Sequence, residues 1–562
     1  MQAAILQDEK KLNSLLVETK NQEDFDSEEG MKIPKPFVIV NGSLYKREIK
    51  REETLKMISR KVPTITKEFL NIEKPHVMYE IEWNERNKKV KEIVPASTIA
   101  IKKELLELSL KGFSVNENNA KPLIEYLDLF LNCNVIEQYA AVERLGLIKN
   151  HFVHPLLRND IEVVAGDEGD YQLKDGFEIK GTSNSWKLEV FERIKNYPKA
   201  VFFVLASFAS VIIKDLGIQP FIVDLSGATS QGKTTTLKVA ASVWGNDGLI
   251  NEWNATKVSI ERKAAYLNSF PLLMDDTRKA DDKVLNIIIY QFSGGKSKGR
   301  GSLNGNQKEY TWNNILLSTG EVSLNEYAKN QGGVAARVIP LVDQPLKSNH
   351  ADIMQLVEGV RNNYGAIGID FLILWLKEKK ELIPEYHKVR MHFINRAKRN
   401  EVLNRLAGYY AAVYFTGSIL KKYLGINVNL EALLYLFEEI AYENKSIDMP
   451  MQFFEEILTD LDSNRLSIYY PGSYKPNMMN AIYRNKTLYL HPKYIKSMLG
   501  VEERQIRKEW LKRGLTVGKS ENGSFVDYKS IKHEGQTYRV VEINMDYVNK
   551  LGFDFNDNKY QR

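Results

Sequence analysis

The feature that most constrains this chain is a short apolar run that ends in a glycine-bracketed loop. Residues 221–226 read Phe-Ile-Val-Asp-Leu-Ser, and residues 227–234 read Gly-Ala-Thr-Ser-Gln-Gly-Lys-Thr. Apolar residues then recur at helical spacing from Thr235 to Val243. A strand, a loop that ends in Gly-Lys-Thr and a helix form the context in which such a loop binds nucleotide phosphates. The sequence therefore predicts a nucleotide site, and this flanking pattern disfavours a chance match.

The residue types of the loop suit a polyphosphate. Gly227 and Gly232 let backbone N–H groups turn inward around phosphate oxygens, and the helix N-terminus adds a partial positive charge. Lys233 is expected to reach the β- and γ-phosphates, and the Thr234 hydroxyl to bind Mg²⁺. ATP and Mg²⁺ are thus the predicted cofactors. The predicted nucleotide-binding residues of the loop are Gly227, Ser230, Gln231, Gly232, Lys233, Thr234 and Thr235.

A second apolar run ends in two carboxylates about 40 residues after the loop. Residues 270–276 read Phe-Pro-Leu-Leu-Met-Asp-Asp. Alone, this run would predict an ordinary strand that enters an acidic turn. After a phosphate-binding loop it is typical of a Walker B strand. Asp275 is then expected to hold Mg²⁺ through water, and Asp276 to orient or deprotonate the attacking water.

A glycine-rich basic stretch follows at residues 294–308, with four basic residues and no acid. Asn304-Gly305 near its middle predicts a β-hairpin. Cations on such a hairpin suit phosphate contacts, which fix position without reading base sequence. A mobile surface loop fits the same residues equally well. The predicted DNA-binding residues are Lys296, Lys298, Arg300 and Lys308.

Polar residues also follow later apolar runs. Residues 311–321 predict a buried strand, and Ser318 or Thr319 at its end would sense the γ-phosphate. Arg337 lies among small and apolar residues just before another predicted strand, where an arginine can complete a neighbouring subunit's site. Arg405, at the start of an apolar helix, is predicted to reach the nucleotide as a lid arginine. The alternatives are a helix-end cation for Arg337 and a surface arginine for Arg405. The predicted catalytic residues are Lys233, Asp275, Asp276, Thr319 and Arg337.

Composition indicates a soluble globular protein. The chain has 562 residues, 43% of them hydrophobic and 27% charged, a length typical of about three or four domains. The single cysteine, Cys133, excludes a disulfide framework and a cysteine zinc site, and it suits a reducing cytoplasm. We expect neither a signal peptide nor a membrane-spanning segment. Because the net charge is only +6, polyanion binding would depend on local patches.

The predicted fold class is α/β, with a P-loop ATPase core and flanking domains. The end of the chain reads as helix, turn, helix and two wings, with a surplus of basic residues that indicates DNA binding. A winged helix used for protein contacts is the alternative. The helix at 503–513 carries Arg504, Arg507, Lys508, Lys512 and Arg513. The predicted domains are an N-terminal helix and acidic linker (1–31), an α+β domain (32–180), the ATPase core (181–345), a helical lid region (346–470) and a winged helix (471–562).

The order of these motifs resembles a family of MCM-like AAA+ helicases from bacterial mobile elements and phages. The chain is similar in particular to the helicases of staphylococcal chromosome cassettes and related pathogenicity islands. The likeness covers roughly residues 35–420. It rests on the phosphate loop, Trp253-Asn-Ala-Thr, Pro-Leu-Leu-Met-Asp-Asp, Gly-Lys-Ser-Lys-Gly-Arg, Trp312-Asn-Asn-Ile-Leu-Leu-Ser-Thr-Gly-Glu and Ala-Arg-Val-Ile-Pro-Leu.

The resemblance implies a homo-hexameric ring that hydrolyses ATP and translocates along DNA in the cytoplasm, without a membrane. It also implies that Lys296, Lys298 and Arg300 lie on a pore hairpin, and that Arg337 is an arginine finger. Two features depart from the family pattern. The Walker B strand ends Asp-Asp where Asp-Glu is usual, and the zinc cysteines of many MCM N-terminal domains are absent.

Two other functions fit parts of the sequence. One is an AAA+ remodeller of proteins, although residues 294–306 lack the aromatic residue that a protein-threading pore usually presents. The other is a nucleotide-switched protein that binds a replication origin through the C-terminal winged helix. Stimulation of ATPase activity by single-stranded DNA rather than by unfolded protein would favour the helicase.

Overall fold

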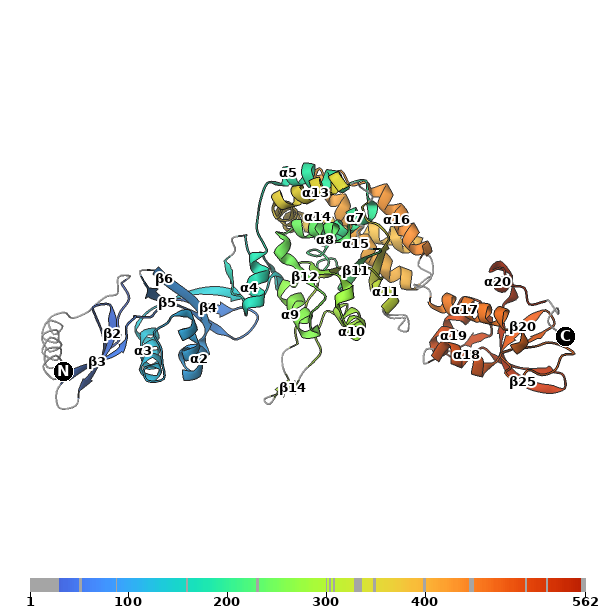
Figure 1. Cartoon of the computed structure of the whole chain (residues 1–562), viewed down its shortest axis with the longest axis horizontal. Coiled ribbons are helices and arrows are strands. Elements are labelled where there is room, and N and C mark those ends of the chain that lie inside the picture. Colours follow the sequence, from blue (N-terminus) through green and yellow to red (C-terminus); the bar gives the residue numbers. More distant parts are fainter. Residues whose placement is uncertain are drawn as a thin grey trace. The chain divides into compact units, whose positions relative to one another are not determined.

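A computed structural model describes most of the chain, apart from the N-terminus and several short segments (Figure 1). The described residues are 30–49, 53–86, 88–157, 160–228, 232–299, 301–302, 305–306, 309–327, 336–346, 350–397, 401–443, 449–500, 503–521 and 524–556. The chain divides into two compact units, Met1–Glu178 with Arg262–Phe270, and Ile179–Glu261 with Pro271–Arg562. The helix predicted near the N-terminus and the acidic stretch after it lie outside the described residues.

The described residues of the first unit form three sheets, of which β8 and β9 make the smallest, and several helices. Its antiparallel three-stranded sheet joins β1 (Phe37–Val40), β2 (Ser43–Ile49) and β3 (Glu53–Ser59). The β1–β2 turn uses Asn41 and Gly42, both at positive φ, as a two-residue type I′ hairpin requires. The second sheet has the order β10 (Ile161–Val163), β7 (Glu137–Val142), β4 (Thr64–Asn71), β5 (Val77–Glu85) and β6 (Lys88–Pro95).

Helices cover this mixed sheet and close its core. The described part of residues 32–180 thus contains both sheets and helices. The buried side chains include Trp83, Leu123, Tyr126 and Phe130. The other elements of the unit are η1 (Ala96–Ile99), α2 (Lys102–Glu107), η2 (Leu108–Lys111), α3 (Ala120–Cys133), β8 (Gly146–Ile148), β9 (His151–Val153) and α4 (Glu168–Asp175).

The second unit is built on a five-stranded parallel sheet. Its strand order is β12 (Ile250–Glu252), β13 (Leu272–Asp275), β16 (Ile315–Gly320), β11 (Phe221–Ser226) and β17 (Val338–Val342). All four pairings are parallel. Strands β11 and β16 are buried along their full length, as expected where helices cover both faces of a parallel sheet. The carboxyl ends of β11, β13 and β16 therefore meet at one edge.

Helices surround this sheet. Helix α7 includes the most apolar run of the sequence and is almost completely buried, because α8, α15 and α16 pack against it. Among the described residues, no helix combines the length and apolarity needed to cross a membrane. The helices are α5 (Ser183–Trp186), η3 (Lys187–Phe191), α6 (Glu192–Ile194), α7 (Pro198–Ala209), α8 (Lys233–Ser242), η4 (Asp247–Leu249), α9 (Lys257–Leu267), η5 (Thr277–Lys279), α10 (Asp282–Phe292), α11 (Leu324–Tyr327), α13 (His350–Asn362), α14 (Ala366–Arg396), α15 (Glu401–Leu424) and α16 (Leu430–Glu443).

The C-terminal region has its own apolar core. Its sheet has the order β18 (Ile468–Tyr469), β19 (Ala481–Arg484), β20 (Thr487–Leu490), β25 (Gln536–Ile543) and β21 (Thr516–Val517), and β24 (Tyr528–His533) also pairs with β25. The remaining elements are α17 (Met449–Ser463), η7 (Arg465–Ser467), α18 (Pro492–Leu499), α19 (Glu503–Lys512), β22 (Lys519–Glu521), β23 (Ser524–Val526) and α20 (Met545–Lys550).

Helix α17 belongs to this C-terminal core. Its residues Phe454, Ile457 and Leu461 pack in one cluster with Trp510 and Val541. The boundary predicted at residue 471 therefore separates side chains that pack together. The sequence could not predict this packing. The amphipathic pattern of residues 449–463 is the same whether the helix covers the preceding helices or the following sheet.

Helix α19 does not expose all of its basic residues. Arg507 is only 5% exposed. Its guanidinium donates to Asp527 (Nε to Oδ2, 2.8 Å) and to Glu503 (Nη1 to Oε1, 2.8 Å), and it lies 3.8 Å from the ring centre of Tyr528. Arg507 is therefore not part of an exposed cationic surface, because its side chain holds β24 to α19. Arg504 and Lys508 on the same helix remain exposed.

Removal of one partner of this buried pair is expected to destabilise the C-terminal region. Asp527→Ala removes the more deeply buried of the two carboxylates that pair with Arg507, at a cost of about 3–5 kcal/mol. The unfolding midpoint of this region, followed by hydrogen exchange, should fall accordingly. Replacement of both residues, Arg507→Met with Asp527→Leu, should restore most of the loss. Lys512→Ala, a change at an exposed cation, should shift stability by less than about 1 kcal/mol. A loss after Asp527→Ala no larger than that would contradict a structural role for the pair.

Candidate nucleotide-binding site

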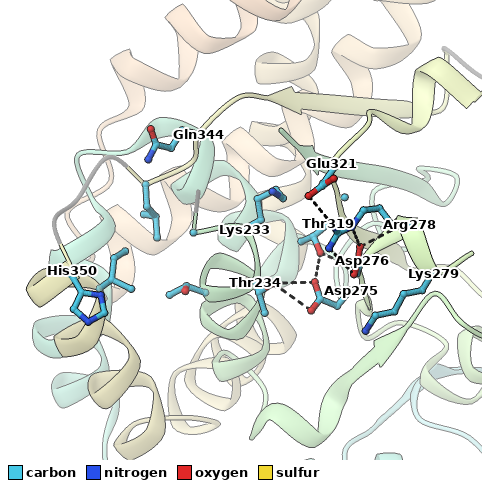
Figure 2. Close-up of a pocket in the computed structure, with 15 residues that line it drawn as sticks. Lys233, Thr234, Asp275, Asp276, Arg278, Lys279, Thr319, Glu321, Gln344 and His350 are labelled. Carbon is cyan, nitrogen blue, oxygen red and sulfur yellow. Dashed lines mark hydrogen bonds and ion pairs between the residues drawn. The ribbon is translucent and has the colours of Figure 1, made fainter. Parts of the chain in front are cut away.

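The carboxyl edge of the parallel sheet opens on a cavity of about 520 Å³. Seven predicted residues line it: Gly232, Lys233, Thr234, Thr235, Asp275, Asp276 and Thr319. Eight further lining residues were not predicted: Arg278, Lys279, Gly320, Glu321, Gln344, Leu346, His350 and Ile353. Figure 2 shows the acidic residues on one side of Thr234 and His350 on the other. The cavity thus has an ionic end and a less charged end.

The loop between β11 and α8 provides the backbone of the site. Gly232 precedes α8 with φ of 81°, and a Cβ there would lie 3.1 Å from Leu346, so a larger residue would be strained and crowded. The Lys233 ammonium donates to the carbonyls of Gly227 (2.8 Å) and Ala228 (2.6 Å). Burial lowers the pKa of Lys233. Ser230 and Gln231 lie outside the described residues.

Asp275 links the ends of three elements. The hydroxyl of Thr234, in the first turn of α8, donates to its carboxylate at 3.3 Å, and the hydroxyl of Thr319, at the end of β16, donates to the same Oδ1. Figure 2 shows both contacts. A hydroxyl and a carboxylate oxygen that face one point are the hard oxygen ligands that Mg²⁺ prefers. Thr234 and Asp275 therefore fit a magnesium site.

Ser318 and Thr319 point to opposite faces of β16, as neighbours on a strand do. The Thr319 hydroxyl bonds to Asp275 and lines the cavity. The Ser318 hydroxyl accepts instead from the indole N–H of Trp253 at 3.2 Å, and Ser318 is fully buried. Of the two sensor candidates left open by the sequence, only Thr319 faces the cavity.

Asp276 is held by a neighbouring cation. Its backbone adopts φ of 60°, and its carboxylate accepts from Arg278 (Nε to Oδ1, 3.0 Å). This hydrogen bond, with the charge of Arg278, lowers the pKa of Asp276. Arg278 also donates from Nη1 to Glu321 Oε1 at 2.9 Å. No motif includes Arg278, and the motif that ends at Glu321 gives that residue no role, because the pairing of the two depends on contacts between two strand ends.

A buried carboxylate lies within the strand that leads into the loop. Asp224 of β11 is fully buried and accepts from the backbone N–H of Leu324 at 2.8 Å. Burial raises the pKa of Asp224 to about 6. This contact fastens the first residue of α11 to the strand that precedes the predicted phosphate-binding loop.

Arg337 and Arg405 lie at the other end of the sheet. The Arg337 carbonyl accepts from the N–H of Ile222, near the start of β11, and its guanidinium lies 4.4 Å from the ring centre of Tyr290. The charges of Arg405 and Arg337 both act on Tyr409, although burial sets the raised pKa of that phenol. Neither arginine lines the cavity. The expectation that Arg405 reaches the nucleotide does not hold within one subunit.

The basic stretch after α10 contains a short hairpin. Strand β14 (Gly301–Ser302) pairs with β15 (Gly305–Asn306), and a bridge between Lys296 and Thr311 closes its base. The base is tight, since a Cβ on Gly295 would lie 2.9 Å from the Trp312 carbonyl oxygen. Lys296 and Lys298 are exposed. Arg300 and Lys308 lie outside the described residues.

Comparison with known proteins places this geometry in context. A family model described as "Domain of unknown function (DUF927)" matches residues 38–312. A solved structure described as "SCCmec type IV Cch - active helicase" superposes with a TM-score of 0.70 at 17% identity, over 92% of this chain and 99% of that one. The apo C-terminal region of NrS-1 gives a TM-score of 0.29 at 10% identity, over 85% of this chain and 96% of that one. No curated protein matches the sequence.

The fold and the site together define a mixed α/β protein with a helicase-like fold. The superposition spans nearly the full length of both chains, so the likeness in fold extends beyond the parallel sheet. The chain is similar in fold to the helicase of a staphylococcal chromosome cassette.

Proposed function

We propose that this chain is an ATP-dependent DNA helicase with an AAA+ core, which acts as a ring in the replication of a mobile element. The observation that carries the proposal is the convergence of Lys233, Thr234, Asp275 and Thr319 on one cavity at the carboxyl edge of a parallel sheet. The similarity in fold to a cassette helicase supports it.

In this proposal the triphosphate lies between Lys233 and the carboxylates. The N-terminus of α8 and the Lys233 ammonium bind phosphate oxygens, so Lys233 exchanges its two loop carbonyls for the ligand. Mg²⁺, held by Thr234 and Asp275, would neutralise charge on the phosphates. Asp276 orients the attacking water. The base lies toward the less charged end of the cavity, lined by Leu346, His350 and Ile353.

The second part of the site comes from a neighbouring subunit. Strand β11 has six residues and so separates its two ends by about 17 Å. Arg337 and Arg405, at its amino end, are therefore too far from their own phosphate loop to act there. Arg337 and Arg405 thus lie at the amino edge of the sheet, whereas the described residues of the nucleotide site at the carboxyl edge include no such arginine finger. This arrangement favours a closed ring of identical subunits, in which each site receives its arginine from the next subunit.

In this proposal, the basic hairpin and the C-terminal region bind DNA. Lys296 and Lys298 lie at the base of a glycine-rich hairpin whose residues 294–306 contain no aromatic side chain, which suits a nucleic-acid backbone better than an unfolded protein. A winged helix formed by α18, α19 and the β24–β25 ribbon, with exposed Arg504 and Lys508, would bind duplex DNA. We also propose that the first three domain boundaries lie where the sequence predicts them, after residues 31, 180 and 345.

Lys233→Ala is expected to abolish ATP turnover. Without the ammonium, the γ-phosphate loses its main electrostatic partner, and kcat should fall by about 10²–10³-fold. Measurements of ATPase activity with single-stranded DNA, and of unwinding of a forked duplex, would test this. Lys238→Ala changes a half-buried lysine on the same helix, outside the cavity lining, and is the control. Retained unwinding in Lys233→Ala, or stimulation by unfolded protein instead of DNA, would remove the assignment.

Arg337→Ala should retain ATP binding and lose hydrolysis, by about 10³-fold if the arginine acts in trans. When the variant is mixed with Asp276→Ala, part of the activity should return. In a mixed ring, some sites combine an intact Asp276 with an intact Arg337 from the neighbour. Normal hydrolysis by Arg337→Ala alone would contradict the finger role.

Lys296→Ala with Lys298→Ala should weaken binding of single-stranded DNA and leave basal ATPase activity unchanged. If each lysine neutralises one phosphate, the slope of log K against log salt should decrease by about 1.4. Lys377→Ala with Lys380→Ala removes the same charge from exposed positions on α14 and should leave the slope unchanged. An equal effect of both pairs would show that the hairpin has no special role.

A further inference from the structure

Arg278 lines the cavity but has no role in the reaction proposed above. Among the described residues that line the cavity, it is the only arginine. It lies in η5, directly after the two aspartates, and its side chain is 53% exposed. Its guanidinium bridges two carboxylates, those of Asp276 (3.0 Å) and Glu321 (2.9 Å). Figure 2 shows Arg278 between these two residues.

The turn that presents Arg278 is tightly fixed. Asp276 caps η5 and also accepts from the Arg278 backbone N–H at 3.4 Å. Thr277 packs directly against Gly320, where an added Cβ would lie 2.0 Å from its hydroxyl oxygen. The backbone of Arg278 is thus held at the end of β16, next to Glu321. Because the side chain itself is half exposed, the guanidinium can change partners while the turn stays in place.

Both carboxylates are ligands that a phosphate can replace. A guanidinium binds phosphate and carboxylate through the same two-pronged geometry. Lys233, Thr234 and Asp275, which would hold the phosphates and Mg²⁺, line the same cavity. An incoming triphosphate therefore brings its terminal oxygens to the end of the cavity where Arg278 lies.

We propose that Arg278 binds the γ-phosphate of the nucleotide, and that its ion pairs with Asp276 and Glu321 form a latch that ATP opens. This inference rests on the proposed function. When the guanidinium moves to the phosphate, the carboxylate of Asp276 is free to contact water. Water attacks the γ-phosphorus while the bond from that phosphorus to the bridging oxygen of the β-phosphate breaks, and Asp276 receives the water proton. Inorganic phosphate and ADP then leave the cavity. Arg278 then returns to the carboxylates.

The latch makes opposite predictions for its two sides. Arg278→Ala removes a charged contact to the γ-phosphate, so affinity for ATPγS should fall about tenfold, whereas affinity for ADP changes less than about twofold. Glu321→Gln removes a competitor for the guanidinium, so affinity for ATPγS should rise while affinity for ADP stays the same. A purely structural role would weaken both nucleotides equally in both variants.

Titration calorimetry of the full chain with Mg²⁺ and either ATPγS or ADP tests the proposal. Arg361→Ala, at an exposed pair on α13, is the matched control and should leave both affinities unchanged. Arg278→Gln, which keeps the size and a hydrogen-bond donor, replaces Arg278→Ala if the latter unfolds, and it should show the same selective loss. An unchanged ratio of ATPγS to ADP affinity in the Arg278 variants would overturn the latch alone. Absence of nucleotide binding by the wild-type chain would overturn the proposed function and the latch together.

Discussion

The structure of the site depends on one carboxylate that three elements share. Asp275 ends β13, accepts from Thr234 at the start of α8 and accepts from Thr319 at the end of β16. This is possible because β16 lies between β11 and β13, and all three strands run in the same direction. The strand order therefore places Thr319, the proposed γ-phosphate sensor, between the loop after β11 and the acidic end of β13. Replacement of any one of these three side chains would therefore alter the hydrogen bonds that position the other two.

Local patterns in the sequence were sufficient to predict elements whose signals come from neighbouring residues. Strand β11 and helix α8 occupy the predicted ranges, since Gly232 and Lys233 carry their own conformational and chemical signals. Contacts between strand ends carry no such signal. Arg278 and Glu321 are separated by 43 residues and meet only through the sheet. The choice between Ser318 and Thr319 likewise required the register of β16, which decides the face on which each side chain lies.

Charge was the least reliable guide in the C-terminal region. Five basic residues on one helix predict a cationic face, yet Arg507 is buried against Asp527 and Tyr528, and Arg513 donates to Glu509 at 2.8 Å. A count of cations does not show which of them have carboxylate partners. The basic residues of this helix that are exposed are Arg504, Lys508 and Lys512. The Lys512 ammonium lies 3.5 Å from a carboxylate oxygen of Glu509. The net surplus of charge is therefore a weaker indication of DNA binding than the position of the unburied side chains.

Helix α10 begins six residues after Asp276 and ends at Phe292, just before the basic hairpin. Eleven helical residues span about 16 Å and resist bending, since each turn is closed by its own hydrogen bonds. The helix is therefore a stiff rod with the ionic end of the cavity at one tip and Lys296 beyond the other. In the proposed function, a small tilt of this helix on loss of phosphate charge would displace the lysines without unfolding of any intervening segment.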